Sequence, residues 1–411
     1  MSVWLARLTA RKACVGGNEA SRTFPRPARP GLAFQAVRAA SRQTVLTSLA
    51  SARRLCEATL KGNPDMSDTD MESLLERGYE FEEQERYGDA LAIYEQAVTQ
   101  DPGHSEAWYL KGEALFSLER YDESLAAFER ALTLDPNESD TWIGKGNALT
   151  ALERRTEAVE AYERAITLDP TQAVGWLLKG IALFDLGQTM PALQAFERAT
   201  SLDPTEAEAW VSKGEALADL ERSEEAVASY DRALDLDGDN VDAWIGRGDA
   251  LDDLDDPLAA LESYERALAL EPRNADAQSG RGDALASMER YEEALAAYDK
   301  ALAMEAENPR AWAGRAAALT SVERFPESLE AFDKAISFDD QNALLWLFRG
   351  NTLSLMDRAQ EALAAYEKAI SLDPAFAWAW QGKAHSLRAL GRTNEADAAQ
   401  RKADQLEPPE E

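Results

Sequence analysis

Histidine and cysteine are the side chains most often used for acid–base and nucleophilic chemistry, and this chain contains few of either. Its two cysteines, Cys14 and Cys56, do not form a CxxC pair, so neither a zinc site nor a disulfide scaffold is indicated. Its two histidines, His104 and His385, are far apart, and neither has a serine, a cysteine or metal ligands near it in sequence. We therefore expect no catalytic residues, no cofactor and no enzymatic activity.

The acidic segment from Asp235 to Asn240 is similar to a calcium-binding loop. Its glycine, Gly238, stands at the fourth place rather than the sixth, and no glutamate stands at the twelfth. We expect this segment to form a turn between helices, and we predict no metal site.

The charge of the chain restricts its partners. The 411 residues include 43 Lys+Arg and 75 Asp+Glu, which gives a formal net charge of -32. Phosphate binding needs a basic surface, so nucleic acid is excluded as an expected partner, whereas a basic partner would be attracted. The sequence contains no apolar run long enough to span a bilayer, so we predict no membrane insertion and a cytoplasmic location.

One pattern returns every 34 residues from Met71 onward, without insertion. A small residue, called the marker here, recurs in each copy at Gly78, Gly112, Gly146, Gly180, Gly214, Gly248, Gly282, Ala316, Gly350 and Ala384. In most copies a tryptophan precedes the marker by four residues, and a tyrosine or phenylalanine follows it by sixteen. The copies begin near residues 71, 105, 139, 173, 207, 241, 275, 309, 343 and 377.

Each position of the pattern has a physical reason. Apolar residues three and four apart predict amphipathic helices, and the marker lets the two helices of a hairpin approach closely. We expect the tryptophan and the later aromatic residue to be buried between hairpins. Asp-Pro pairs such as Asp135-Pro136 end the second helices, whereas Pro257 and Pro326 suit a first helical turn. Because one hairpin cannot bury its apolar face alone, the hairpins must stack.

The pattern resembles that of the tetratricopeptide repeat family, W-x2-L-G-x2-Y followed by A-x3-F, A and P. The resemblance covers residues 71 to 408 and implies an all-α fold, an α-solenoid in which ten helix-turn-helix repeats form a right-handed superhelix. Before each marker this chain carries lysine or arginine, from Arg77 to Lys383, where the family usually has leucine. This WxxKG variant is similar to repeats common in methanogenic archaea and some bacteria. We expect the aliphatic part of each lysine or arginine side chain to pack on a neighbouring helix and its charged end to pair with a carboxylate.

Residues 1–65 differ from the remainder of the chain, since they contain eleven Lys+Arg, three Asp+Glu and no copy of the repeat. Three interpretations compete: translation that begins at Met66, a disordered basic arm that docks on the acidic solenoid, and an organelle transit peptide. The predicted domains are therefore this basic segment, 1–65, and the repeat solenoid, 66–411.

In the family the first helices of the repeats line a concave groove, and the resemblance carries its positions onto this chain. The candidate partner-binding residues are Val174, Leu177, Ile181, Phe184, Glu208, Glu215, Asp219, Asp242, Asp249, Asp252, Asp276, Asp283, Leu344, Leu347 and Asn351. Such a groove suits a basic, partly apolar peptide, although the acidic residues could instead only keep a long solenoid soluble.

The leading hypothesis is a non-catalytic adaptor or scaffold that holds a peptide or a partner's helix in this groove. Two alternatives stand beside it. One is a structural role through self-association of solenoid ends, and the other is an accessory subunit that presents substrates to a separate enzyme.

Overall fold

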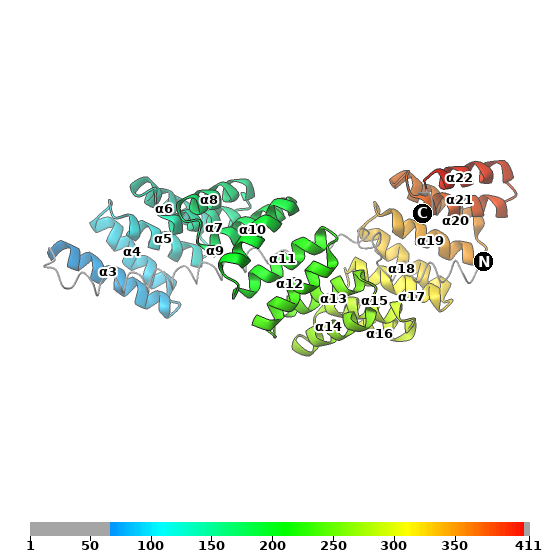
Figure 1. Cartoon of the computed structure of the whole chain (residues 1–411), viewed down its shortest axis with the longest axis horizontal. Coiled ribbons are helices and arrows are strands. Elements are labelled where there is room, and N and C mark those ends of the chain that lie inside the picture. Colours follow the sequence, from blue (N-terminus) through cyan, green and yellow to red (C-terminus); the bar gives the residue numbers. More distant parts are fainter. Residues whose placement is uncertain (1–65, 407–411) are drawn as a thin grey trace. The chain divides into compact units, whose positions relative to one another are not determined.

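The computed structural model describes residues 66–406 of the chain, and every regular element in that range is an α-helix. First and second helices of hairpins alternate along the chain (Figure 1). The first helices are α3 Met66–Glu83, α5 Ser105–Ser117, α7 Ser139–Ala151, α9 Ala173–Asp185, α11 Ala207–Asp219, α13 Val241–Asp253, α15 Ala275–Ser287, α17 Pro309–Ser321, α19 Ala343–Leu355 and α21 Ala377–Ala389. The second helices are α4 Tyr87–Gln100, α6 Tyr121–Leu134, α8 Arg155–Leu168, α10 Thr189–Leu202, α12 Ser223–Leu236, α14 Pro257–Leu270, α16 Tyr291–Met304, α18 Phe325–Phe338, α20 Ala359–Leu372 and α22 Thr393–Leu406.

This arrangement confirms the predicted all-α solenoid of about ten repeats. The nine predicted starts from 105 to 377 coincide with the first residues of α5 to α21, whereas α3 begins at Met66, earlier than the predicted 71. The chain divides into two compact units between Leu220 and Glu221, in the turn between α11 and α12. Within the described residues, one unit holds α3 to α11 and the other α12 to α22.

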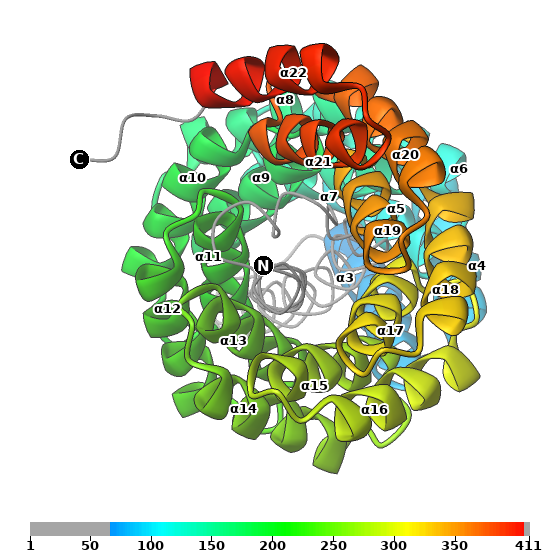
Figure 2. The same cartoon turned by 90° about the vertical axis from the view of Figure 1, so that its right-hand side faces the viewer.

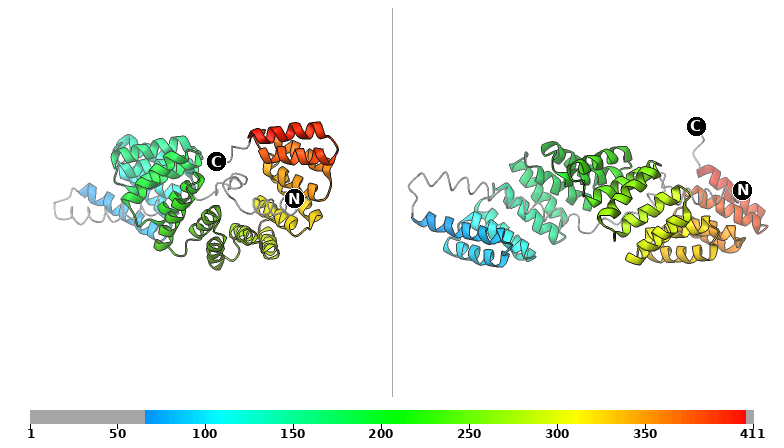
Figure 3. Two further views of the ribbon diagram at one scale, coloured as in Figure 1. Left: turned by 45° about the vertical axis from the view of Figure 1, so that its right-hand side comes forward. Right: turned by 90° about the horizontal axis from the view of Figure 1, so that it is seen from below.

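The hairpins of each unit stack in two layers of helices. In the unit from Glu221 onward, α13, α15, α17, α19 and α21 form the inner layer, and α14, α16, α18, α20 and α22 form the outer one (Figure 2). Each second helix also packs against the first helix of the following hairpin, as α14 does against α15. Figure 3 shows this succession of stacked hairpins in each unit. The first helices of a unit therefore form a continuous layer.

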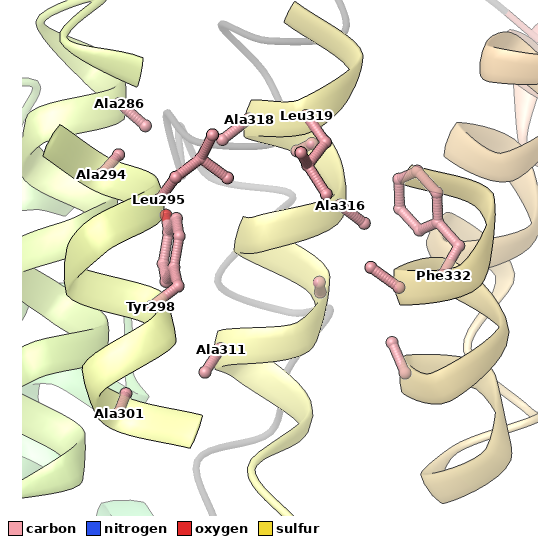
Figure 4. Close-up of a cluster of buried hydrophobic side chains, with 14 of the residues drawn as sticks. Ala286, Ala294, Leu295, Tyr298, Ala301, Ala311, Ala316, Ala318, Leu319 and Phe332 are labelled. Carbon is pink, nitrogen blue, oxygen red and sulfur yellow. The ribbon is translucent and has the colours of Figure 1, made fainter. Parts of the chain in front are cut away.

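The markers lie directly under the aromatic rings of the second helices. A Cβ atom added to Gly112 would come within 2.7 Å of the ring of Phe128, and one added to Gly144 within 2.6 Å of the same ring. Phe128 is thus held between α5 of its own hairpin and α7 of the next. Figure 4 shows the equivalent packing of Tyr298, which lies between α16 and the alanine-rich face of α17. The predicted close approach at the markers and the predicted burial of these rings are confirmed.

The prediction that the tryptophans are buried is wrong, because each of them is only half-buried. The indole Nε1–H donates to the backbone carbonyl of the residue six positions earlier, as from Trp142 to Pro136 at 3.0 Å and from Trp210 to Pro204 at 3.1 Å. This bond holds the ring at the turn between repeats, where part of it remains in contact with solvent. The tryptophan therefore ties the turn to the helix as well as filling space.

The basic residues before the markers behave as predicted. Lys145 Nζ lies 3.0 Å from Oε1 of Glu129 on the preceding second helix and 5.5 Å from the centre of the Trp142 ring. Arg349 pairs with Asp333 at 2.8 Å in the same way. These carboxylates are about half exposed, so each pair contributes little to the free energy of folding.

The turns repeat as regularly as the helices. Asp135 ends α6 in an extended conformation, and its Oδ1 accepts a 2.9 Å bond from the backbone N–H of Asn137. Pro257 and Pro326 lie in first helical turns, as predicted. The segment that resembles a calcium loop covers the end of α12 and this inter-repeat turn, in which the Asn240 side chain caps α13. Between the helices of the hairpins, one residue in each turn has positive φ: Glu85, Glu119, Glu153, Gly187, Glu221, Asp255, Glu289, Glu323, Asp357 and Gly391.

Candidate binding surface

Two side-chain positions on the first helices carry most of the candidate residues. The rim position, two residues before each tryptophan site, is occupied by Glu72, Glu106, Asp140, Val174 and Glu208 in the first unit and by Asp242, Asp276, Arg310, Leu344 and Trp378 in the second. Glu106 and Asp276 are exposed and the others are half-buried. The rim position therefore gives the first-helix layer side chains that reach solvent.

The ring-facing position directly follows each marker and meets the aromatic ring of the same hairpin. The Tyr162 hydroxyl donates to Oδ1 of Asn147 at 2.9 Å, and Tyr366 donates to Oδ1 of Asn351 at 2.7 Å. Where this position holds apolar Ile181, the ring is Phe196, which has no hydroxyl. The residue at this position is thus largely committed to packing with its own hairpin.

The predicted apolar residues are divided between core and surface. Leu177, Ile181 and Leu347 are buried, so they offer little area to a ligand. Val174, Phe184 and Leu344 are half-buried and retain some contact with solvent.

Arg310 forms ion pairs with two acidic candidate residues of the second unit, Asp249 and Asp283. Its Nη1 lies 3.0 Å from Oδ1 of Asp249 and its Nε lies 2.7 Å from Oδ2 of Asp283. The hydroxyls of Tyr264 and Tyr298 donate to these carboxylates at 2.8 Å and 2.6 Å. Arg310 lies on α17, and its guanidinium therefore bridges Asp249 of α13 and Asp283 of α15.

These contacts change the expected electrostatics of the groove. The Arg310 side chain is 27% exposed, and those of Asp249 and Asp283 are 7% and 14% exposed. Burial raises the pKa of Asp252 well above its usual range, and the charge of Asp283 adds to the effect. The candidates Asp249 and Asp283 are therefore not free negative charges but parts of an internal ion network.

Sequence reasoning missed Arg310. It stands at the rim position, where Glu106, Asp140, Glu208, Asp242 and Asp276 carry negative charge. The reversal of charge at one repeat-equivalent position was the signal that could have identified it. The negative charge expected of the groove is therefore partly offset in this unit, because the chain supplies its own cation there.

The first unit has a buried acidic cluster, defined here as Glu82, Glu113 and Asp140. Glu82 is 8% exposed and Glu113 is 4% exposed. Burial raises the pKa of Glu82 to about 8 and that of Glu113 well above its usual range, and the charges of Glu82 and Asp140 act on Glu113. The Tyr94 hydroxyl lies against the Glu82 carboxyl, and the hydroxyl of Tyr109 has no hydrogen-bond partner among residues 66–406.

The remaining candidates lie apart from this cluster. Burial raises the pKa of Glu208 to about 7, and the neighbouring charge of Glu215 contributes. Asp219 is exposed and accepts a 2.6 Å bond from the Thr189 hydroxyl. Asp242 is half-buried. His104 accepts through Nδ1 from the backbone N–H of Ala107 and so caps α5.

The fold is a solenoid of helical hairpins, and the sequence comparisons place it within a family. Sequence profiles described as tetratricopeptide repeats match residues 75–139, 117–173, 177–241, 245–303, 281–343, 343–376 and 365–398. The chain therefore belongs to the tetratricopeptide repeat family. Repeats of this family form protein–protein interaction scaffolds. No curated protein matches this sequence, and the similarity to archaeal repeats stays a prediction.

Several solved structures are similar to this chain at low sequence identity. The Cut9 chain of the Cut9–Hcn1 hetero-tetramer is 14% identical with a TM-score of 0.54, over 94% of this chain and 89% of that one. Yeast Tom70 is 16% identical with a TM-score of 0.41, over 83% of this chain and 92% of Tom70. YrrB, described as having an unusual peptide-binding site, is 23% identical with a TM-score of 0.40, over 45% and 95%.

No helix within residues 66–406 combines the length and the apolar character needed to cross a bilayer. The basic segment 1–65, with Cys14 and Cys56, lies outside the described residues, so the three interpretations of it stay predictions.

Proposed function

We propose that this protein is a non-catalytic adaptor that binds an extended segment of a partner protein along the first-helix layer of its repeats. The rim position supports this proposal, because it recurs at every repeat with side chains that reach solvent. In the first unit it carries carboxylates at Glu106, Asp140 and Glu208 and an apolar side chain at Val174. A basic, partly apolar segment complements that sequence of chemical groups.

The contribution of charge to this binding is electrostatic attraction screened by salt. Debye screening shortens to about 8 Å at physiological ionic strength, so affinity should fall as salt rises. It should not vanish at high salt, because Val174 and Phe184 would still bury apolar area. A cytoplasmic location and the absence of catalytic activity belong to the same proposal.

Selection from a displayed library of random twelve-residue peptides on the full chain tests this function. We expect enrichment of peptides with basic and apolar residues, and loss of their binding when Glu106 and Glu208 are both changed to Gln. Glu160 and Glu197 are exposed on second helices, so Glu160→Gln with Glu197→Gln is a control of equal charge. Equal loss in both variants would show non-specific attraction. Failure to enrich any peptide, together with concentration-dependent oligomers in sedimentation, would favour the self-assembly alternative.

A further inference from the structure

The turn between the two helices of a hairpin carries the same ion pair in eight of the described hairpins. An arginine directly before the second helix pairs with an aspartate or glutamate three residues later, as Arg290 does with Glu293 at 2.7 Å. The residue two positions after the arginine is exposed in all eight hairpins. It is glycine, proline or a polar residue: Gly88, Asp122, Thr156, Glu224, Glu292, Pro326, Gln360 and Asn394.

Two described hairpins lack this ion pair, and both carry a large apolar residue at that exposed position. In the hairpin of α13 and α14, Asp256 and Ala259 stand in place of the pair, and Leu258 is 72% exposed. In the hairpin of α9 and α10 a glutamine and a proline replace the pair, and Met190 is 51% exposed. These are the two most exposed large hydrophobic side chains within residues 66–406. The loss of the ion pair and the gain of solvent-exposed apolar area therefore occur together.

Leu258 has a second exposed leucine beside it and acidic residues around it. Leu254, which directly follows α13, is 36% exposed. Asp255 and Asp256 lie between the two leucines, and Glu262 lies one helical turn after Leu258; all three are exposed. None of these three carboxylates takes part in an ion pair within the part of the chain that the structure describes. This surface, from Leu254 to Glu262, is called the leucine turn here.

The leucine turn is separate from the rim position. Asp242, the rim residue of the same hairpin, stands near the start of α13, whereas Leu254 follows the end of that helix. An α-helix rises 1.5 Å per residue, so about 18 Å of helix lies between the two positions. A ligand at the leucine turn therefore needs contacts other than those of the rim residues.

We propose that the leucine turn is a second docking surface, which binds a partner segment whose apolar side chains are flanked by lysine or arginine. Burial of the exposed leucines favours association, and basic flanks pair with carboxylates that have no cation of their own. A second copy of this chain docking through the same turn is disfavoured, because the contact would bring like charges together. The inference goes beyond the proposed function, since it uses none of the rim residues.

The test uses the full chain and a blocked fourteen-residue peptide of leucine and lysine, with its leucines three and four residues apart. One matched probe replaces each leucine with serine, and another replaces each lysine with glutamate. We expect both matched probes to bind about tenfold more weakly in fluorescence anisotropy at fixed salt. Equal binding of the serine probe would overturn the inference, because charge alone would then explain the attraction. Absence of binding by the leucine–lysine peptide would also overturn it.

The main variant copies the turn of the hairpin of α15 and α16 into the leucine turn. Asp256→Arg, Leu258→Glu and Ala259→Glu together leave the net charge unchanged and supply an ion pair equivalent to that of Arg290 with Glu293. We expect this variant to bind the leucine–lysine peptide about tenfold more weakly and to melt no lower than the wild type. Because the charge is the same, non-specific attraction of a basic peptide cannot account for such a loss.

Leu258→Gln tests the apolar contact alone and should weaken the leucine–lysine peptide about fivefold. Leu270→Gln is the matched control, because Leu270 is 39% exposed at the other end of α14, and it should change the affinity less than about twofold. Unchanged binding in the Leu258→Gln variant or in the triple variant, or an equal loss in Leu270→Gln, would overturn the inference.

Competition separates this inference from the proposed function. A library-selected peptide whose binding needs Glu106 and Glu208 should leave the leucine–lysine peptide bound at the leucine turn. Complete displacement would overturn the inference and leave the proposed function standing. Failure of the library to give any such peptide, while the triple variant still loses affinity, would count against the proposed function and support the leucine turn.

Discussion

The hydroxyl of Tyr264 donates a 2.8 Å hydrogen bond to Oδ1 of Asp249, fifteen residues earlier on the preceding helix. The same spacing joins Tyr162 to Asn147, Tyr298 to Asp283 and Tyr366 to Asn351. The ring-facing residue and the ring therefore vary together, since apolar Ile181 and Ala317 accompany Phe196 and Phe332. Phe128 departs from the rule, because it accompanies Glu113.

This relationship predicts opposite effects for one substitution at two sites. Phe128→Tyr would place a hydroxyl near Glu113. A Cβ atom added to Gly144 would lie close to both the Phe128 ring and Oε1 of Glu113, so the ring and this carboxylate oxygen are near each other. We expect the substitution to stabilise the first unit by about 1 kcal/mol through a new hydrogen bond. Phe196→Tyr would bury its hydroxyl against Ile181 and should destabilise by about 1–3 kcal/mol. Urea denaturation followed by circular dichroism measures both, and equal effects would contradict the pairing rule.

The half-buried tryptophans predict a graded loss of stability. Trp142→Phe keeps most of the ring packing but removes the 3.0 Å bond to the Pro136 carbonyl, so it should cost about 1 kcal/mol. Trp142→Ala should cost more, about 2–4 kcal/mol, and should make unfolding multi-state because distant repeats remain folded. Thermal unfolding monitored by circular dichroism distinguishes these cases. A Phe variant as unstable as the Ala variant would show that the indole bond dominates over packing.

Arg310→Met should be strongly destabilising, because it leaves the carboxylates of Asp249 and Asp283 buried without their cation. We expect a loss of about 2–4 kcal/mol in urea denaturation. Arg315→Met removes a guanidinium from the same helix whose partner, Asp299, is 60% exposed, and should cost less than about 1 kcal/mol.

Neutralising the acids provides the corresponding rescue. Arg310→Met combined with Asp249→Asn and Asp283→Asn should recover most of the lost stability, since no unpaired charge then remains buried. If the combined variant is no more stable than Arg310→Met alone, the loss arises from packing of the arginine stem and not from charge.

The buried carboxyl of Glu82 predicts a pH dependence of unfolding. Burial raises its pKa to about 8 in the folded protein from an ordinary value of 4.5, so the folded state holds a proton that the unfolded state releases. Its contribution to stability is full below pH 4.5 and is lost as the pH rises through about 8. Each pKa unit corresponds to about 1.4 kcal/mol.

Glu82→Gln should remove this dependence and slow hydrogen exchange of the amides of α3 and α4 at pH 8. The neighbouring Glu113 and Asp140 also titrate, so the change between pH 5 and pH 8 is to be compared between variants. Glu76→Gln, on the exposed side of α3, should leave the wild-type pH profile unchanged. An identical profile in the Glu82→Gln variant would contradict the raised pKa.

The repeat period, the helix starts and the buried rings could be predicted from the sequence, because each is a local pattern repeated in every copy. Gly112 is one example: its spacing from Phe128 is fixed within one hairpin, so a short stretch of sequence contains the whole contact. The burial of Leu177, Ile181 and Leu347 could not be predicted in this way, since it depends on the rotation of each first helix against the next hairpin.

The ion network was harder to predict because it joins residues of three repeats. The bond from Arg310 to Asp249 spans 61 positions and depends on how much successive first helices are offset. Family positions suggested that Asp249 and Asp283 bind a partner, whereas the structure pairs them with a residue of the chain itself. The reversed charge at the rim position is the feature of the eighth repeat, which begins at 309, that points to this network.

The positive-φ residue in each hairpin turn has a consequence for how such a chain can change. Non-glycine residues in this conformation carry a cost of about 1–2 kcal/mol, yet Glu153, Glu289 and Glu323 adopt it with φ of 58°, 60° and 62°. The turn geometry is therefore imposed by the stacked hairpins rather than chosen by its own residue. A whole repeat could therefore be duplicated or deleted without a change in the sequence of the hairpin turns. Each such change would alter the distance between two partner-binding positions by one repeat, and the residues at each position would stay the same.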